Sequence, residues 1–224
     1  MRSWLFLLLS AALPAHAAPP GQVEIEYELR RNGSAIAEVH ERLEHGNGTY
    51  QLTETWRGKG LYRLLGKAKR YSRGNVTAAG LQPLEFVDER TGRDTARAWF
   101  DWQGGTITMQ YKGERHSRPL PPHAQDRLSF LLALSFVPEG EQPIVFNIAD
   151  GKGGLSHHEY QVAGRERLQT PVGEFDAVRL LREKEDERAE IWLATQLGRL
   201  PVRVLITEDD GTRYEQVVVR ISAP

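Results

Sequence analysis

The chain has 224 residues, 40% of them hydrophobic and 26% charged, and its 29 Lys and Arg nearly balance its 30 Asp and Glu. A chain of this length and composition can bury the core of one globular domain, or at most of two small ones. A formal net charge of −1 argues against a general nucleic-acid binder. The sequence contains no cysteine, which excludes disulfides, thiolate metal sites, a cysteine nucleophile and a lipid-modified cysteine. We therefore expect neither a nucleic-acid partner nor a lipid anchor.

The first 17 residues have the pattern of a secretory signal peptide. Arg2 supplies a positive charge, apolar residues fill 4–9 and 11–13, and Ala15-His16-Ala17 has the small-x-small pattern that precedes cleavage. This apolar stretch is too short to cross a bilayer, which takes about 20 residues. We predict that residues 1–17 are a cleaved signal peptide and that residues 18–224 form a single β-rich domain.

Downstream of this segment the dominant pattern is an alternation of apolar and charged residues. Val23, Ile25, Tyr27 and Leu29 alternate with charged residues, which predicts a half-buried antiparallel strand. Asn32-Gly33 follows, a dipeptide suited to a tight hairpin turn. Further strands are expected at about hairpin spacing, in all about a dozen. They are centred on residues 35–43, 50–56, 84–90, 95–102, 106–111, 144–149, 156–162, 175–182, 190–194, 202–207 and 213–221. This series predicts a mostly β fold: a curved antiparallel sheet or open β half-barrel with one or two short helices.

Residues 126–137 break the strand pattern. They are apolar except for a few positions, and Pro138 ends the run. We predict a helix of about three turns that is apolar nearly all round, with Asp126 as its cap. Such a helix needs cover on both sides, so it either fills the concave face of the sheet or forms a lid over an apolar cavity.

Residues 58–74 also interrupt the strand pattern, and positive charge is concentrated in and beside them. No acidic residue occurs between Glu54 and Glu85, and Leu61, Leu64, Leu65 and Ala68 fall at helical spacing. This combination is typical of a segment that contacts the head groups of an anionic membrane. The alternative is a solvated strand edge kept cationic to prevent association between edges. The seven basic residues are Arg57, Lys59, Arg63, Lys67, Lys69, Arg70 and Arg73.

Catalytic motifs are scarce. The sequence has no nucleophile elbow, no zinc-protease helix, no phosphate-binding glycine loop and no dinucleotide fingerprint. On a strand, His157 and Glu159 share a face and offer two ligands of a metal site, with His116 or His123 as a distant third. No third ligand is fixed by the spacing, so an exposed polar strand face is the simpler interpretation, and we expect no metal and no cofactor.

Several motifs distributed over the chain resemble those of a known family. They are Tyr71-Ser72-x-Gly74, Gly80-Leu81-x-Pro83, Asp126-Arg127-Leu128-Ser129, Gly173-Glu174-Phe175-Asp176-Ala177-Val178, Glu190-Ile191-Trp192-Leu193-Ala194, Gly198-Arg199-Leu200-Pro201-Val202-Arg203-Val204 and Asp210-Gly211-Thr212. Together they look like the signature of a bacterial exported family known as domain of unknown function 3108. The resemblance covers most of the predicted domain and implies no catalytic residue. The succession of a Trp strand, a Leu-Pro turn and a strand ending in Asp-Gly is also similar to the periplasmic lipoprotein-carrier fold, an open β half-barrel that holds acyl chains under helices.

These observations lead to one preferred function and two alternatives. We predict a non-catalytic, monomeric periplasmic protein that binds an amphipathic or lipid-like molecule in an open β cup, with the apolar helix as a lid and the seven basic residues as head-group or membrane contacts. The first alternative is a cell-envelope interaction or scaffold protein, and the second is a metal-dependent hydrolase that uses His157 and Glu159. The predicted ligand-binding residues are Leu128, Leu131, Leu132, Phe136 and Trp192.

Overall fold

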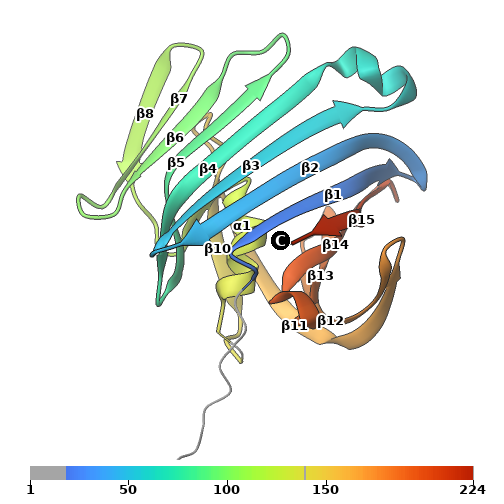
Figure 1. The fold of residues 1–224 in the computed structure, drawn as a ribbon. Coiled ribbons are helices and arrows are strands. Elements are labelled where there is room, and N and C mark those ends of the chain that lie inside the picture. The colour runs from blue at the N-terminus through green and yellow to red at the C-terminus, as the bar shows by residue number, and fades with distance from the viewer. Residues whose placement is uncertain (1–18, 139, 224) are drawn as a thin grey trace, which may run out of the picture.

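The computed structural model describes residues 19–138 and 140–223 (Figure 1), so the predicted signal peptide, residues 1–17, lies outside the described residues. The first half of the described chain contains β1 (Gln22–Arg31), β2 (Ser34–Gly46), β3 (Thr49–Gly58), the 3₁₀ helix η1 (Gly60–Leu65), β4 (Lys67–Thr77), β5 (Gly80–Arg90), β6 (Ala96–Asp101), β7 (Thr106–Tyr111) and β8 (Glu114–Pro119). The second half contains β9 (Ala124–Asp126), α1 (Ser129–Ala133), η2 (Leu134–Phe136), β10 (Ile144–Ala149), β11 (Leu155–Thr170), β12 (Gly173–Glu183), β13 (Glu187–Ala194), η3 (Thr195–Leu197), β14 (Leu200–Glu208) and β15 (Arg213–Ser222).

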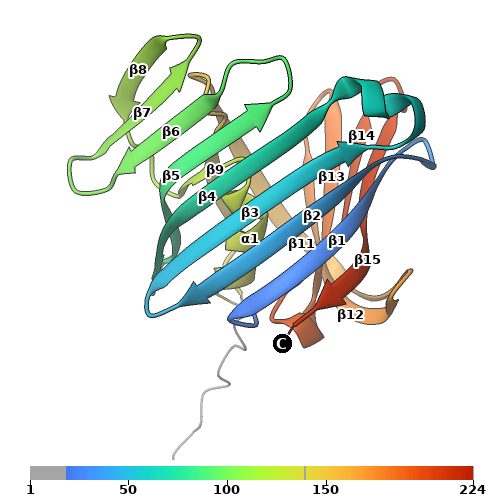
Figure 2. The same ribbon diagram turned by 45° about the horizontal axis from the view of Figure 1, so that its top comes forward.

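All fifteen described strands belong to one curved sheet. Its order is β8-β7-β6-β5-β4-β3-β2-β1-β15-β14-β13-β12-β11-β10-β9, so β1 and β15 pair in the middle and β8 and β9 form the two edges. Every pairing is antiparallel except that of β9 with β10. Figures 1 and 2 show two arms of the sheet, a first arm of β1–β8 and a second arm of β9–β15, folded towards each other with α1 between them. The predicted mostly β fold with an open, curved antiparallel sheet is confirmed.

The alternation read from the sequence decides which face of each strand is buried. In β1, Val23, Ile25 and Tyr27 are buried, whereas the intervening glutamates reach the surface. The turn to β2 is Asn32-Gly33, and both residues have positive φ angles, 49° and 82°. Glycine reaches this backbone region without a steric penalty and asparagine tolerates it, which is why this dipeptide closes the hairpin.

Two predicted helical segments differ from what the structure shows. The helix expected over residues 126–137 begins only at Ser129, because residues 124–126 form β9 and pair in parallel with β10. α1 and η2 together span eight residues, 129–136. The segment 58–74 is helical only as η1, and from Lys67 it continues as β4, where hydrogen bonds with β3 and β5 on either side outweigh the local helical spacing.

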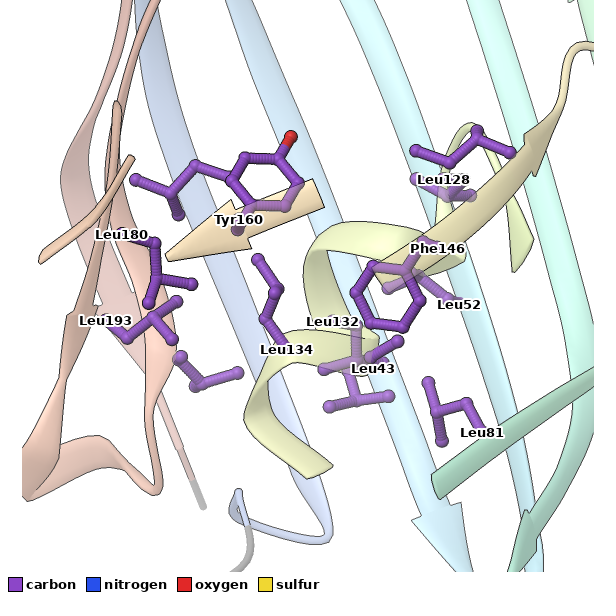
Figure 3. Packing of buried hydrophobic residues seen from close by; sticks show 14 of the residues in the cluster. Leu43, Leu52, Leu81, Leu128, Leu132, Leu134, Phe146, Tyr160, Leu180 and Leu193 are labelled. Atoms are coloured by element: carbon purple, nitrogen blue, oxygen red, sulfur yellow. The ribbon is translucent and has the colours of Figure 1, made fainter. Parts of the chain in front are cut away.

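The core lies on the concave face, between α1, η2 and the two arms. Leu134 is fully buried there, and Leu132 packs on the strands of the first arm (Figure 3). The helix therefore fills the concave face, which is the first of the two roles considered from the sequence. The labelled residues of this cluster are Leu43, Leu52, Leu81, Leu128, Leu132, Leu134, Phe146, Tyr160, Leu180 and Leu193.

Candidate functional site

A cavity of about 380 Å³ lies beside η2, where β5, β9 and β10 approach the end of the helix. Phe136 and Val137 form one wall, and Trp102 reaches the cavity from the turn between β6 and β7. The Trp102 indole N–H donates a hydrogen bond of 2.7 Å to the carbonyl of Pro83, which fixes the ring at this position. The remaining lining residues are Ala79, Gly80, Leu81, Gln82, Pro122, His123, Gln125, Ala133, Pro138, Glu141, Ile144, Val145 and Phe146.

The chemistry of this cavity is mainly apolar, with polar groups at its mouth. The rings of Trp102, Phe136 and Phe146 and several aliphatic side chains supply most of the lining, whereas His123 and Glu141 are exposed to solvent. A site of this volume is within the range of about 300–1,000 Å³ that small-molecule sites occupy. The arrangement can accept an apolar group inside and leave a polar group in water.

A buried hydrogen-bond network fixes the helix that forms one wall of the cavity. The Asp126 carboxylate accepts hydrogen bonds from the backbone N–H groups of Leu128 and Ser129, both at 2.8 Å, at the start of α1. Its other oxygen accepts a hydrogen bond of 2.6 Å from the Ser72 hydroxyl on β4. Since the Ser72 hydroxyl donates to Asp126, the Tyr50 hydroxyl donates to the Ser72 oxygen, 3.0 Å away. The N-cap of α1 is Leu128 and not Asp126 as predicted, but Asp126, two residues earlier, accepts from the N–H groups at the helix start and also ties that start to the sheet.

Gln125 extends this network to the cavity. Its side-chain amide donates to the carbonyl of Leu81 at 2.8 Å and accepts from the Ser129 hydroxyl at 2.9 Å. The pKa of Asp126 is raised above its usual value because the carboxyl is buried, although the hydrogen bonds from Ser72 and Ser129 oppose that shift. All of these residues except Tyr50 fall in or beside motifs noted in the sequence, and the structure gives those motifs a packing role.

A row of charged side chains crosses the concave face beyond this network. Glu41, Glu54, Arg70 and Asp88 lie on neighbouring strands and are cross-strand partners in turn. Arg70 contacts Glu54 at 2.8 Å and Asp88 at 3.5 Å, and Arg90 contacts Asp88 at 2.7 Å. Burial and the neighbouring charge of Glu54 raise the pKa of Glu41 to about 8, so this carboxyl holds its proton in neutral solution.

The structure distributes the five predicted ligand-binding residues over three environments. Leu128 and Leu132 are buried in the core, and Leu131 and Leu132 line a space of only about 10 Å³ between α1 and β1–β3, the volume of about one water molecule. Phe136 lines the 380 Å³ cavity. Trp192 lies on the opposite face of β13 from Leu193, because successive residues of a strand alternate between faces.

Trp192 is held there by polar partners. Its indole N–H donates to Glu166, and the guanidinium of Arg203 lies 4.7 Å from the ring centroid. The structure therefore brings Phe136 and the helix leucines into one region, whereas Trp192, a buried member of the same cluster, points from the other face of β13. A ligand-binding role for the five residues stays a prediction, and in this conformation only Phe136 borders a space of ligand size.

The seven predicted head-group contacts also separate. Arg70 belongs to the buried charged row, Arg73 pairs with Glu85 at 2.9 Å, and Lys59 contacts Glu28 and Glu38, both at 3.1 Å. The other four make no ion pair with any described residue, and they gather around η1 at the end of the β3–β4 hairpin. These four are Arg57, Arg63, Lys67 and Lys69.

The alternative metal site gains no further ligand from the fold. His157 and Glu159 lie on one face of β11, and the ring of His157 contacts the side chain of Asn147 at 3.2 Å. Within the described residues, no group of three His, Cys, Asp or Glu side chains is placed to hold a metal ion.

No pattern in the sequence identified the cavity itself. Besides the helix end and the residues that follow it, its walls come from residues 79–82, 102, 122, 123, 125 and 144–146, which only the fold brings together. The Gly80-Leu81-x-Pro83 motif was a signal for one wall, since Gly80 has a φ of 101° and begins β5. Trp102, the last residue of the predicted strand 95–102, carried no signal that distinguishes it from an ordinary strand residue.

The chain matches a family model and is similar to several solved structures. A protein from Parabacteroides distasonis, a candidate lipoprotein, shares 6% identity, with 92% of this chain and 97% of its own covered at a TM-score of 0.38. A candidate exported protein with a YmcC-like fold from Bacteroides fragilis shares 9% identity with the same coverage at a TM-score of 0.41. No curated protein sequence matches the chain, and none of its described helices is long and apolar enough to span a membrane. The model of the family described as protein of unknown function DUF3108 matches residues 22–218, so the chain belongs to this family, as its motifs predicted.

Proposed function

We propose that this protein is a non-catalytic protein of the bacterial cell envelope that binds an amphipathic molecule in the cavity beside η2. The observation that carries the proposal is the cavity of about 380 Å³ with aromatic and aliphatic walls. Its volume fits the apolar part of a single-chain amphiphile better than a whole two-chain phospholipid. The envelope location is inferred from the apolar, signal-like segment at residues 4–13.

The proposed binding mode follows from the lining. The apolar chain lies against Phe136, Phe146 and Trp102, where its transfer from water is favourable by about 25 cal/mol for each Å² of apolar surface buried. The polar head stays at the mouth, near His123 and Glu141, which are exposed. The buried contacts of Asp126 hold α1, and through it η2, in place, so the wall exists before the ligand arrives.

Native mass spectrometry of the protein purified from an envelope extract, followed by organic extraction, tests the proposal directly. We expect a single-chain amphiphile to co-purify and to be lost on denaturation. Binding is then measured by titration with a dansyl-labelled fatty acid. Replacing Val137, which lines the cavity, with Trp fills part of the space, and we expect at least a tenfold weaker affinity.

Val162→Trp is the matched control. Val162 lies on β11, is 36% exposed and does not line the cavity, so the same substitution there leaves binding unchanged. Thermal melts establish that both variants fold. A purified protein that is reproducibly empty and takes up no probe contradicts the proposal, as does equal probe affinity of wild type and a folded Val137→Trp variant.

A further inference from the structure

Two leucines at the end of the β3–β4 hairpin are almost fully exposed. Leu61 has 86% and Leu64 has 89% of its surface accessible, whereas Val172, the next most exposed large aliphatic side chain among the described residues, has 38%. Both leucines lie in η1, three residues apart. In a 3₁₀ helix, side chains at positions i and i+3 project from the same side. The two leucines therefore form one apolar projection at the end of the hairpin, where Figures 1 and 2 show the short coil between β3 and β4.

Positive charge surrounds this projection. Arg57 and Lys67 are directly opposite each other in the β3–β4 ladder, and Lys69 shares their face because it is two residues along the strand. Together with Arg93 they line a surface hollow of about 360 Å³, which contains Glu89 as its acidic residue. None of these four basic side chains forms an ion pair within the described part of the chain. Like charges held this close favour an anionic partner.

The backbone presents the leucines in a fixed position. The N–H of Lys59 donates to the carbonyl of Ile36 at 2.8 Å, and the Lys59 ammonium contacts two glutamates. On the other side of η1, the N–H of Lys67 donates to the Thr91 hydroxyl at 3.0 Å. Gly66 has a φ of 82°, and a Cβ at this position would lie 2.5 Å from the Cβ of Thr91, so glycine is required there. The exposure of the leucines is thus built into the fold.

We propose that the η1 tip, residues 57–69, docks on an anionic phospholipid bilayer. Leu61 and Leu64 enter the boundary between head groups and acyl chains, and Arg57, Lys67 and Lys69 contact lipid phosphates. A narrow apolar projection with a cationic rim suits a bilayer, which supplies an apolar phase directly beneath a negatively charged surface. This docking goes beyond the function proposed above, because it requires no ligand in the cavity beside η2.

Vesicle flotation of the purified protein tests this proposal. We expect the protein to float with vesicles that contain phosphatidylglycerol and phosphatidylcholine, to remain behind with phosphatidylcholine alone, and to detach when salt is raised. The Leu61→Ser/Leu64→Ser double variant loses at least about tenfold in affinity because less apolar surface is buried. The Arg57→Gln/Lys67→Gln/Lys69→Gln variant loses about a hundredfold at low salt.

Matched controls separate local from general effects. Leu84→Ser/Val172→Ser removes two other partly exposed aliphatic side chains, and Lys112→Gln/Arg118→Gln/Lys184→Gln removes three exposed charges elsewhere, so both variants float like wild type. Equal binding to neutral and anionic vesicles, normal flotation of the folded leucine variant, or no flotation at all overturns the proposal. So does binding to polyglutamate in place of vesicles, which would assign the tip to an acidic protein partner.

Discussion

Removing the Asp126 carboxylate tests whether the buried network holds α1 to the sheet. In Asp126→Ala, the backbone N–H groups of Leu128 and Ser129 lose their acceptor in a buried setting, and the Ser72 hydroxyl loses its partner. An unsatisfied buried donor costs about 1–3 kcal/mol, and loss of a capping side chain costs about 0.5–2 kcal/mol. The two costs overlap, because the capping side chain is the acceptor of the same buried N–H groups. Removing the buried carboxyl group also removes the cost of burying it, which offsets part of the loss. We therefore expect the free energy of unfolding to fall by about 2–4 kcal/mol, a large part of the stability of an ordinary domain.

Asp126→Asn is the informative companion. The amide oxygen can still accept from Leu128 and Ser129, and its NH₂ group can donate to the Ser72 oxygen. We expect a loss below about 1 kcal/mol. Because the folded-state pKa of Asp126 is raised, the free energy of unfolding of the wild type falls as the pH rises through that pKa. The Asn variant has no such proton to lose, so the difference in stability between the two proteins narrows over the same pH interval.

Urea unfolding, followed by far-ultraviolet circular dichroism at several pH values, measures both variants. The transition midpoint and its slope are compared with those of wild type, since an unchanged slope shows that the same surface is exposed on unfolding. Wild-type stability of Asp126→Ala would show that the network does not hold α1 to the sheet. The reasoning also fails if Asp126→Asn is destabilised as much as Asp126→Ala, since the network would then depend on the negative charge and not on the acceptor geometry.

The remaining predictions concern a titrating carboxyl and the core. Glu41 has a pKa of about 8 in the folded protein, well above its usual 4.5, so its contribution to stability is complete below pH 4.5 and is lost as the pH rises through 8. Glu41→Gln should flatten that decline, which is at most about 1.4 kcal/mol per pH unit for one proton, and identical pH profiles from urea titrations would contradict the assignment. Leu134→Ala, at a fully buried position on η2, should cost about 2–5 kcal/mol in the same assay. Leu84→Ala, at a partly exposed position, should stay within about 0.5 kcal/mol of wild type.

The strands that could be predicted from the sequence are those with one apolar face. β7 and β10 match their predicted ranges because apolar residues alternate along them against a solvated face. β8 was not predicted, since all six of its residues are exposed and it has no apolar periodicity. β4 was missed for a related reason. Its inward positions are Ala68, Arg70, Ser72 and Gly74, which are small or polar and pack through hydrogen bonds and ion pairs.

Strand pairings between segments that are distant in the sequence could not be predicted either. Residues 124–126 stand at the start of the predicted helix 126–137 and have no strand pattern of their own, and only their parallel pairing with residues 147–149 makes them a strand. The same limit applies to the cavity beside η2, whose walls are contributed by several separate parts of the chain. Phe136 could be predicted because it belongs to the local apolar run, whereas Trp102 and Phe146 could not.

The basic segment shows how the fold refines a pattern of charge. The sequence alone does not distinguish the seven basic residues from one another. In the structure, strand alternation points Arg70 inward, where it forms ion pairs with Glu54 and Asp88. Of the seven, Arg57, Arg63, Lys67 and Lys69 form no ion pair with a described residue, whereas Lys59 and Arg73 contact glutamates. Local composition therefore predicted a concentration of positive charge, and the register of β3 and β4 decided which side chains point outward.

The two proposed sites lie at opposite ends of the same strands. η1 precedes Lys67, where β4 begins, and the cavity is lined from Ala79, just after β4 ends at Thr77. Eleven residues of strand at about 3.3 Å each place the two sites roughly 35 Å apart along β4. A bilayer that receives Leu61 and Leu64 therefore does not reach the cavity in the same orientation. Substitutions at the tip should leave probe binding unchanged, and Val137→Trp should leave flotation unchanged. If either substitution abolished both properties in a folded protein, the two sites would have to be coupled through β4 and β5.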